Sequence, residues 1–272
     1  MNPIDAAILG LVEGLTEYLP VSSTGHLILT GRLLRLSGEG PKSFEIVIQL
    51  GAILAVVVHY RTLLAARFKG LVLRQPESLR LFAALLIAFF PAALVGFVLH
   101  KTIKHYLFHP LPVAAALIVG GVAMIAIERI RRHKAIQGDD GLEHVDWKRA
   151  LWIGIGQCLS LWPGSSRSMC TIVAAQLTGL STRTAADFSF LLALPTLGAA
   201  TVYELYKDHE VLMASSGGWL PIGVGLAVSF LVAWAVIAGF VKYLQRRGLE
   251  PFGWYRIVVA LVVFWAMSSP AA

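Results

Sequence analysis

Charged residues and cysteines are both scarce in this sequence. Asp, Glu, Lys and Arg make up only 14% of the 272 residues, whereas hydrophobic residues make up 57%. A soluble domain carries about 25% charged residues, so this composition argues against an ordinary water-soluble protein. The two cysteines, Cys158 and Cys170, lie in apolar surroundings, which argues against a disulfide framework or a thiolate metal site. The sequence instead predicts a polytopic membrane protein.

Basic residues outnumber acidic ones, and the chain has a formal net charge of +7. They fall in short loops between apolar runs rather than along one exposed face, so we expect no nucleic-acid partner. Two sets of loops alternate along the chain, one richer in Lys and Arg than the other. The rich loops are 61–80, 129–149 and 241–252, with 5, 6 and 3 such residues, and the poor loops are 31–43, 100–112 and 207–217, with 3, 2 and 1. The positive-inside rule places the first set in the cytoplasm and the second set, with both termini, outside.

Six apolar runs are each close to the roughly 20 residues that a helix needs to cross a bilayer. Two further apolar segments are interrupted: residues 10–31 by Pro20, and residues 152–180 by Pro163 and Gly164. We expect both to be re-entrant hairpins of broken helix, because proline does not continue a helix. The six expected transmembrane helices are 44–60, 81–99, 113–127, 188–206, 219–241 and 254–267.

Similar residues recur along the chain at an interval of 144. The matching pairs are Gly10 with Gly154, Glu13 with Gln157, Pro20–Ser23 with Pro163–Ser166 after a slip of one residue, and Phe44 with Phe188. Each half therefore contains one broken hairpin followed by three spans. Because three is an odd number, the second half is expected to be inverted relative to the first, so that the hairpins enter the membrane from opposite faces.

The expected fold is an all-α polytopic membrane protein that forms a single transmembrane domain over residues 1–272. It consists of two inverted-topology repeats, each a re-entrant broken-helix hairpin plus three transmembrane helices. Irregular backbone at membrane depth is tolerated only where it lines a cavity or is buried in protein, so the two hairpins are expected to meet inside. The expected parts are repeat 1 at about 1–130, a cytoplasmic loop at about 129–149 and repeat 2 at about 150–272.

Two carboxylates lie in the first broken segment at membrane depth. Each ionised carboxylate there costs roughly 2.5–3.5 kcal/mol, which indicates that the pair has a use. Glu13 and Glu17 are four residues apart and share one helix face, where like charges repel unless a proton or a cation lies between them. After Pro20, the turn Ser22-Ser-Thr-Gly25 and His26 provide hydroxyls, backbone N–H groups and an imidazole.

An arginine lies in the second broken segment, which reads Pro163-Gly-Ser-Ser-Arg-Ser-Met-Cys-Thr171. The planar guanidinium of Arg167 can pair with two phosphate oxygens, and the surrounding serine hydroxyls and N–H groups can complete the cradle. Placed opposite Glu17, Ser23 and His26, this arginine forms a phosphate clamp beside a nucleophile and acid–base groups. The combination predicts phosphoryl transfer, with negative charge held by the arginine and by a divalent cation on the carboxylates.

The two motifs resemble those of the undecaprenyl-diphosphate phosphatases, the bacitracin-resistance family of bacterial inner membranes. The resemblance is carried by Glu13-Gly-Leu-Thr-Glu17, Leu19-Pro-Val-Ser-Ser-Thr-Gly-His26 and Pro163–Thr171, and it extends over essentially the whole chain. It implies removal of the terminal phosphate of undecaprenyl diphosphate on the outer face of the inner membrane, which regenerates the lipid carrier of cell-wall synthesis. It also implies dependence on a divalent cation, Mg²⁺ or Ca²⁺, and competition by bacitracin, which sequesters the substrate. The sequence is compatible with a homodimer.

The resemblance and the chemistry of the motifs assign roles to individual residues. Ser23 matches the family's proposed nucleophile, which His26 or Glu17 would activate, and Arg167 matches its phosphate-binding arginine. Glu13 and Glu17 are the expected cation ligands. The expected phosphate-binding groups are Ser22, Thr24, Gly25, Ser165, Ser166, Ser168 and Thr171.

Each of these residues also has a purely structural interpretation. Glutamates that stay protonated can pack between helices, and Arg167 can be a structural counter-ion to Glu17. His26 can cap the turn through a ring nitrogen, and the turn hydroxyls can satisfy the ends of the broken helix. We interpret Glu45 and Gln49, one turn apart, as the polar start of a span rather than as part of the site.

Two other functions compete with this interpretation. A secondary transporter or lipid flippase shares inverted repeats, broken helices and charges near the midplane, but it has no need of a nucleophile. The other class of membrane lipid phosphatase uses a Pro-Ser-Gly-His turn and a later Ser-Arg that is followed by a histidine five residues on. Thr171 and Ile172 occupy the region where that histidine is required, so the second half of its site is missing.

Overall fold

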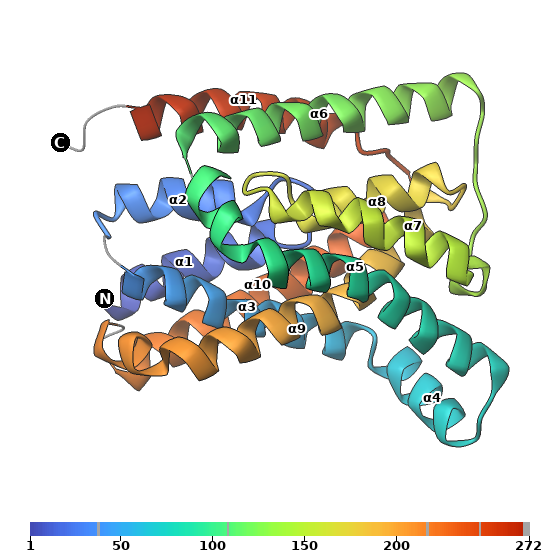
Figure 1. Cartoon of the computed structure of the whole chain (residues 1–272), viewed down its shortest axis with the longest axis horizontal. Coiled ribbons are helices and arrows are strands. Elements are labelled where there is room, and N and C mark those ends of the chain that lie inside the picture. Colours follow the sequence, from blue (N-terminus) through green and yellow to red (C-terminus); the bar gives the residue numbers. More distant parts are fainter. Residues whose placement is uncertain (37–38, 108, 216–217, 245, 269–272) are drawn as a thin grey trace.

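The computed structural model of the chain describes residues 1–36, 39–107, 109–215, 218–244 and 246–268 (Figure 1). Every regular element in these ranges is a helix, which confirms the predicted all-α fold. The helices are α1 (Pro3–Thr16), α2 (Ser23–Leu33), α3 (Glu39–His59), α4 (Arg61–Val72), α5 (Pro76–Leu107), α6 (Pro110–His133), the 3₁₀ turn η1 (Leu142–His144), α7 (Trp147–Cys158), the 3₁₀ turn η2 (Leu159–Leu161), α8 (Arg167–Leu177), α9 (Thr182–Ser215), α10 (Trp219–Leu244) and α11 (Glu250–Ser268).

The long apolar helices make this a multi-pass membrane protein. In the described ranges, four helices are long and apolar enough to cross a bilayer: Pro76–Leu99, Leu111–His133, Thr182–Tyr203 and Trp219–Leu244. A fifth results if Ser43–His59 and Arg61–Val72, which are bent by 76° relative to each other, count as one broken span. The sequence predicts six spans, and the expected sixth, 254–267, is not among them. It coincides with α11, which contains the buried Arg256.

Three segments that the sequence predicts to be loops are partly helical. α4 lies within 61–80, α5 continues through 100–107, and α9 continues as far as Ser215. Hydropathy marks the part of a helix that suits lipid, whereas the helix itself continues until a breaking or capping residue ends it. Pro76 and Pro110 stand at the first positions of α5 and α6, where the missing N–H costs nothing, so the preceding helices end before them.

The two broken segments have the same local structure. In each, an 11-residue helix, α2 or α8, begins directly after a serine with a positive φ angle, 73° at Ser22 and 71° at Ser166. The side chain of Ser22 accepts a hydrogen bond from the Gly25 N–H at 3.4 Å, and that of Ser166 accepts one from the Met169 N–H at 3.3 Å. Serine is a favoured N-cap because its hydroxyl satisfies one of the free N–H groups of the first turn. The same capped turn therefore restarts the helix in both halves.

These caps correct the sequence alignment by one residue. Ser22 corresponds to Ser166 at the interval of 144, whereas the sequence match pairs Ser23 with Ser166. Ser23 corresponds instead to Arg167, and both are the first residues of their helices. The sequence match followed identical side chains, but the turn is defined by its backbone. Each half thus presents a different functional side chain at the same helix start.

The broken hairpins are held by close helix packing from opposite ends of the molecule. α1 packs on α10 and α7 on α5, while α3 contacts both α9 and α10. A Cβ atom at Gly14 would lie 2.6 Å from the Ser229 carbonyl oxygen, and one at Gly154 would lie 2.6 Å from that of Ala88, so only glycine allows these backbones to approach. In Figure 1, the α1–α2 hairpin starts from the end where the N-terminus lies, and the α7–α8 hairpin starts from the end where the 134–146 connection lies.

Large apolar side chains cover the outside of the helices. Phe90 and Phe97 of α5 are 65% and 80% exposed, and Val258 of α11 is 61% exposed. In water such a surface would promote aggregation, whereas in contact with lipid chains an apolar surface is expected. The interior, by contrast, contains buried polar side chains, and those that lie where the two hairpins meet include Glu17, Ser22, Ser168 and Thr171.

Candidate active site

The turns of the two hairpins meet in the interior of the protein. The Ser168 hydroxyl, in the first turn of α8, donates to the Leu19 carbonyl oxygen of the other hairpin at 3.0 Å. The guanidinium of Arg167 donates from Nη2 to Glu17 Oε1 at 3.2 Å, an ion pair in which both side chains are at most 8% exposed. Motifs about 150 residues apart in the sequence therefore form one site, as predicted from the sequence.

Glu17 joins the predicted nucleophile to the predicted phosphate clamp. Its Oε2 accepts a hydrogen bond from the Ser23 hydroxyl at 2.7 Å, while its Oε1 accepts from Arg167. Ser23 and Arg167 are the first residues of α2 and α8, so the N-termini of both helices lie at this carboxylate. Helix N-termini favour negative charge, because their N–H groups and dipoles point outward. The junction has the polarity that an anionic phosphate group requires.

Arg167 is held in place by Glu17, Ser189 and Tyr18. Besides its ion pair with Glu17, its Nη1 donates to the Ser189 carbonyl oxygen at 2.8 Å, and its Cζ lies 5.7 Å from the centre of the Tyr18 ring. Its Nε is buried and has no hydrogen-bond partner in the described residues. A buried donor without a partner is rare and calls for an explanation, and a phosphate oxygen is a suitable acceptor.

Glu13 is fully buried one helical turn before Glu17, and neither of its carboxylate oxygens has a hydrogen-bond partner in the described residues. Glu17 and Glu45 are the acidic groups that act on it electrostatically. In the part of the chain that the structure describes, no three His, Cys, Asp or Glu side chains form a metal cluster. Mg²⁺ needs no such cluster, because it commonly uses one or two carboxylates together with substrate phosphates. The donor set therefore fits a hard divalent cation.

The hydroxyls predicted to bind phosphate mostly make contacts within the protein. Ser22 and Ser166 cap helices α2 and α8. Ser166 also shares a hydrogen bond of 3.0 Å with Ser168, between their Oγ atoms. Thr171 Oγ1 contacts the Ser189 Oγ at 2.6 Å and so supports the segment that holds Arg167. Three predicted residues, Thr24, Gly25 and Ser165, lie in the same turns and make no hydrogen bond to the Glu17 or Arg167 side chain within the described residues. These groups surround the Glu17–Arg167 pair rather than touch it.

His26 makes two contacts, and neither is with the Ser23 hydroxyl. Nδ1 lies 2.8 Å from the Ser22 carbonyl oxygen, and Nε2 lies 2.7 Å from the Tyr255 hydroxyl, with the two rings stacked. A carbonyl can only accept, so Nδ1 carries the proton and, in a neutral ring, Nε2 accepts from Tyr255. This leaves Glu17 as the base in contact with Ser23, whereas the sequence leaves the choice between Glu17 and His26 open.

Arg256 of α11 is a part of the site that the sequence interpretation missed. It is completely buried, and its guanidinium donates to the Pro20 carbonyl oxygen at 3.2 Å and to that of Gly164 at 2.9 Å. Two further bonds reach the carbonyls of Ala116 and Leu117 in α6. Pro20 and Gly164 are equivalent positions in the two hairpin turns. One arginine thus ties both turns to α6.

Sequence signals for the missed residues did exist. An arginine inside a predicted span is functional by default, and Arg256 is such a residue. Ser189 directly follows Phe188, which matches Phe44, so Ser189 is the counterpart of Glu45. Glu45 was interpreted as a polar helix start, yet it is one of the acidic groups that act on Glu13. For Tyr18, an aromatic residue beside Glu17, nothing in the sequence distinguishes a ring that supports Arg167 from one that fills the core.

Comparisons with known proteins agree with this geometry. The profile of the family described as bacitracin resistance protein BacA matches residues 6–262. The undecaprenyl-diphosphatase of Sorangium cellulosum is 59% identical over 261 residues, which cover 96% of this chain and 85% of that protein. The undecaprenyl-diphosphatases of Nitrosomonas europaea and Thermoanaerobacter pseudethanolicus are 46% and 47% identical, each over 96% of this chain and over 93% and 95% of their own lengths. With both motifs brought together in one buried site, this chain belongs to the BacA bacitracin resistance protein family.

Proposed function

We propose that this protein hydrolyses undecaprenyl diphosphate to undecaprenyl phosphate and inorganic phosphate, and so recycles the lipid carrier for cell-wall synthesis and confers bacitracin resistance. The names of its relatives support the substrate. One structural observation carries the proposal: Glu17 accepts the Ser23 hydroxyl on one oxygen and the Arg167 guanidinium on the other. A transporter for anions needs the guanidinium but has no use for a hydroxyl held on a carboxylate.

In the proposed mechanism, Ser23 Oγ attacks the terminal phosphorus while Glu17 accepts its proton. The bond between that phosphorus and the bridging oxygen breaks, and undecaprenyl phosphate leaves with the electron pair. The leaving undecaprenyl phosphate takes the proton from Glu17, which restores the carboxylate. Glu17 then deprotonates a water molecule that attacks the phosphoserine; the bond between phosphorus and Ser23 Oγ breaks, Oγ takes the proton from Glu17, and inorganic phosphate is released. Arg167 neutralises the equatorial oxygens, with its unpartnered Nε as a free donor.

The neighbouring groups have positioning roles in this scheme. The backbone N–H group of Thr24, at the start of α2, and the Ser165 hydroxyl complete the phosphate cradle. The Gly25 N–H and the Ser168 hydroxyl already donate to Ser22 Oγ and to the Leu19 carbonyl oxygen, and they hold the two turns in shape around the phosphate. Ser22 and Ser166 cap the two helices whose N-termini point at the substrate. Thr171 holds Ser189 against Arg167, and His26 fixes the Ser22 carbonyl. Each of these groups already has a partner or lies in the surrounding turn, so none of them is assigned a reacting role.

Glu13 and Glu17 would hold the divalent cation, Mg²⁺ or Ca²⁺. The two oxygens of Glu13 are buried without partners, and carboxylate oxygens are the ligands that these cations prefer. When bound, such a cation neutralises charge on the diphosphate. Glu13 also remains desolvated next to Glu17, so a positive charge between them relieves their repulsion.

The location proposed for the protein is the bacterial inner membrane, with the site opening to the periplasmic face. Inverted repeats are supported by the interval of 144 between equivalent helix starts and by the equivalent packing of α1 on α10 and of α7 on α5. Figure 1 places the N-terminus and the end of α11 at one end of the molecule, and α4 and the 134–146 connection at the other. Bacitracin is expected to compete by sequestering the lipid diphosphate.

The decisive experiment compares phosphate release from undecaprenyl diphosphate by wild type and Ser23→Ala in detergent. We expect the variant to lose at least about 10²-fold in kcat, the order of magnitude that a positioned base and nucleophile provide. Ser160→Ala is the matched control, because this hydroxyl donates to the Gln157 carbonyl outside the site. Wild-type turnover by Ser23→Ala would refute the assignment of Ser23 as the nucleophile and would favour direct attack by water. If the wild-type protein releases no phosphate, the hydrolase function is refuted and the transporter function is favoured.

A further inference from the structure

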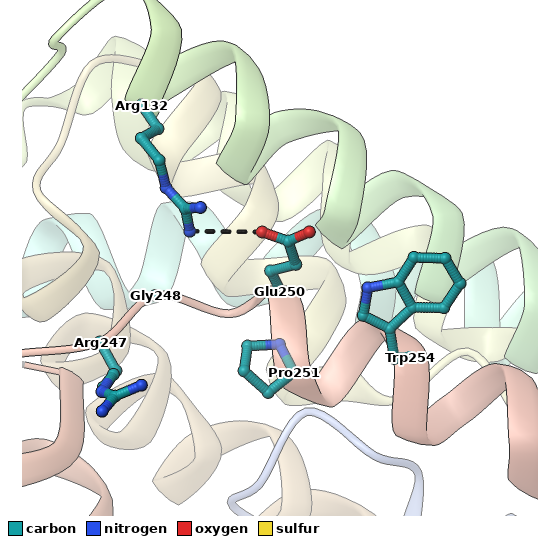
Figure 2. A pocket seen from close by; sticks show the side chains of 6 residues that line it. All are labelled: Arg132, Arg247, Gly248, Glu250, Pro251 and Trp254. Atoms are coloured by element: carbon teal, nitrogen blue, oxygen red, sulfur yellow. Dashed lines mark ion pairs between the residues drawn. The ribbon is translucent and has the colours of Figure 1, made fainter.

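A second charged site lies where α6, α11 and the connection before α11 meet (Figure 2). A pocket of about 450 Å³ is lined there by Arg132, Arg247, Gly248, Glu250, Pro251 and Trp254. None of these residues belongs to the Glu17–Arg167 site. The volume is in the range of pockets that hold small molecules, roughly 300–1,000 Å³.

The charges of this pocket are positive and only partly balanced. Glu250 is the one acidic residue that lines it, and its two oxygens bind Arg129 at 2.9 Å and Arg132 at 3.3 Å. The carboxylate is 16% exposed, whereas the arginine side chains are 60% and 66% exposed. Glu250 therefore orients two guanidinium groups and leaves their outer faces open.

Arg247 adds a third positive charge without a partner of its own. Within the described ranges its guanidinium makes no hydrogen bond or ion pair, although it is exposed and lines the pocket. Nearby Glu128 accepts the Leu249 N–H on Oε2 at 3.2 Å and keeps its negative charge, so three guanidinium groups stand against two carboxylates. With the N-terminus of α11 at the same place, the pocket has an excess of positive charge that favours an anion.

The position of the pocket identifies the kind of anion. It lies at the ends of two candidate spans, Leu111–His133 and Trp219–Leu244, where lipid headgroups are found. Trp254 is 52% exposed beside it, and the Arg129 guanidinium lies 5.9 Å from the centre of its ring. Exposed tryptophan is typical of the membrane interface, because the ring suits the boundary between headgroups and chains.

We propose that this pocket binds the headgroup phosphate of an anionic phospholipid. The phosphate would lie between Arg132 and Arg247, with the glycerol region against Trp254 and Pro251. The lipid would thereby hold the first turn of α11, the helix whose Arg256 binds both hairpin turns. The site is separate from the diphosphate site and does not depend on the reaction proposed for that site.

The test measures lipid binding by the purified, delipidated full chain in detergent. Native mass spectrometry quantifies bound phosphatidylglycerol, with phosphatidylcholine of the same acyl chains as the neutral comparison. We expect phosphatidylglycerol to bind preferentially and Arg247→Gln to weaken it about five-fold, the factor that one basic residue provides at an anionic surface. Arg132→Gln/Arg247→Gln should weaken it about 25-fold. The single variant removes no intramolecular contact, so it keeps the test valid if the double variant unfolds.

The matched control is Arg61→Gln/Arg80→Gln, which removes two exposed arginines outside the pocket. It should bind phosphatidylglycerol like wild type. Equal losses in the control and pocket variants would overturn the proposal in favour of a general charge effect. Unchanged affinity in Arg247→Gln, or binding of inorganic phosphate as tight as that of phosphatidylglycerol, would also overturn it.

Discussion

Replacing Arg256 with methionine removes the guanidinium that joins the two hairpin turns while it keeps a long apolar side chain. The Pro20 and Gly164 carbonyls each lose a hydrogen bond from a charged donor. Such bonds contribute about 1.5–3 kcal/mol each, which makes a loss of about 3–6 kcal/mol. The Ala116 and Leu117 carbonyls lie within α6, where the helix itself supplies donors, so their loss is smaller.

The loss is offset because methionine suits the membrane interior better than arginine. An arginine at membrane depth costs roughly 2.5–3.5 kcal/mol, and Arg256→Met relieves that cost. The net destabilisation is therefore expected to be at most about 3.5 kcal/mol, so the variant should still fold. Its activity should suffer more, because a shift of about 1 Å between reacting groups can cost about 10²-fold.

Two measurements on the same purified protein test this reasoning: the midpoint of thermal unfolding, and kcat and KM for phosphate release. We expect Arg256→Met to lose about 10²-fold in kcat with a moderate fall in Tm. The kcat and Tm of Arg256→Lys should lie between those of wild type and Arg256→Met, because an ammonium group keeps the charge but cannot reach all four carbonyls. Arg80→Met, at an exposed position of α5, is the control. A kcat for Arg256→Met within two-fold of wild type would refute the idea that this residue positions the turns.

Three further predictions concern the cation, the packing and the pH dependence. Glu13→Gln should raise the Mg²⁺ or Ca²⁺ concentration for half-maximal activity at least about ten-fold, since one of two carboxylate ligands is lost; an unchanged requirement in a chelator titration would contradict the assignment. Gly154→Val should lower Tm by an amount equivalent to about 1–3 kcal/mol, because its Cβ would lie 2.6 Å from the Ala88 carbonyl oxygen, whereas Gly239→Ala, with nothing within 4 Å, should be neutral. Hydrogen bonds from Ser181 and then Thr184 hold the pKa of Asp140 below its usual 3.8, so its stabilising contribution is present above that pH and is lost as the pH falls through the lower value. Asp140→Asn should therefore lower Tm at pH 7 and make Tm less sensitive to acid below about pH 4, and parallel Tm-against-pH curves for variant and wild type would contradict this.

Local features of the site could be predicted from the sequence because they depend on neighbours along the chain. Pro20 and Pro163 interrupt apolar segments, and a serine then restarts each helix, which requires only a hydroxyl within reach of the first-turn N–H groups. The cost of burying Glu17 and Arg167 in apolar segments likewise follows from composition. The expectation that the two broken hairpins meet inside the protein is confirmed by the ion pair between these residues. The same reasoning failed at α4, where charged residues were interpreted as a loop although the segment forms a helix.

The sequence by itself determined that the chain is helical, that it suits a membrane, and that two polar turns interrupt its apolar segments, because hydropathy and helix breaking act over a few residues. Only the tertiary structure decided which partner each polar group takes. His26 contacts Tyr255, 229 residues away, and Arg256 reaches carbonyls from both hairpins. Backbone carbonyls are present at every residue, so no sequence pattern marks the ones that a buried guanidinium will bind. That choice depends on how closely the helices pack, and in particular on the glycines that let α1 approach α10 and α7 approach α5.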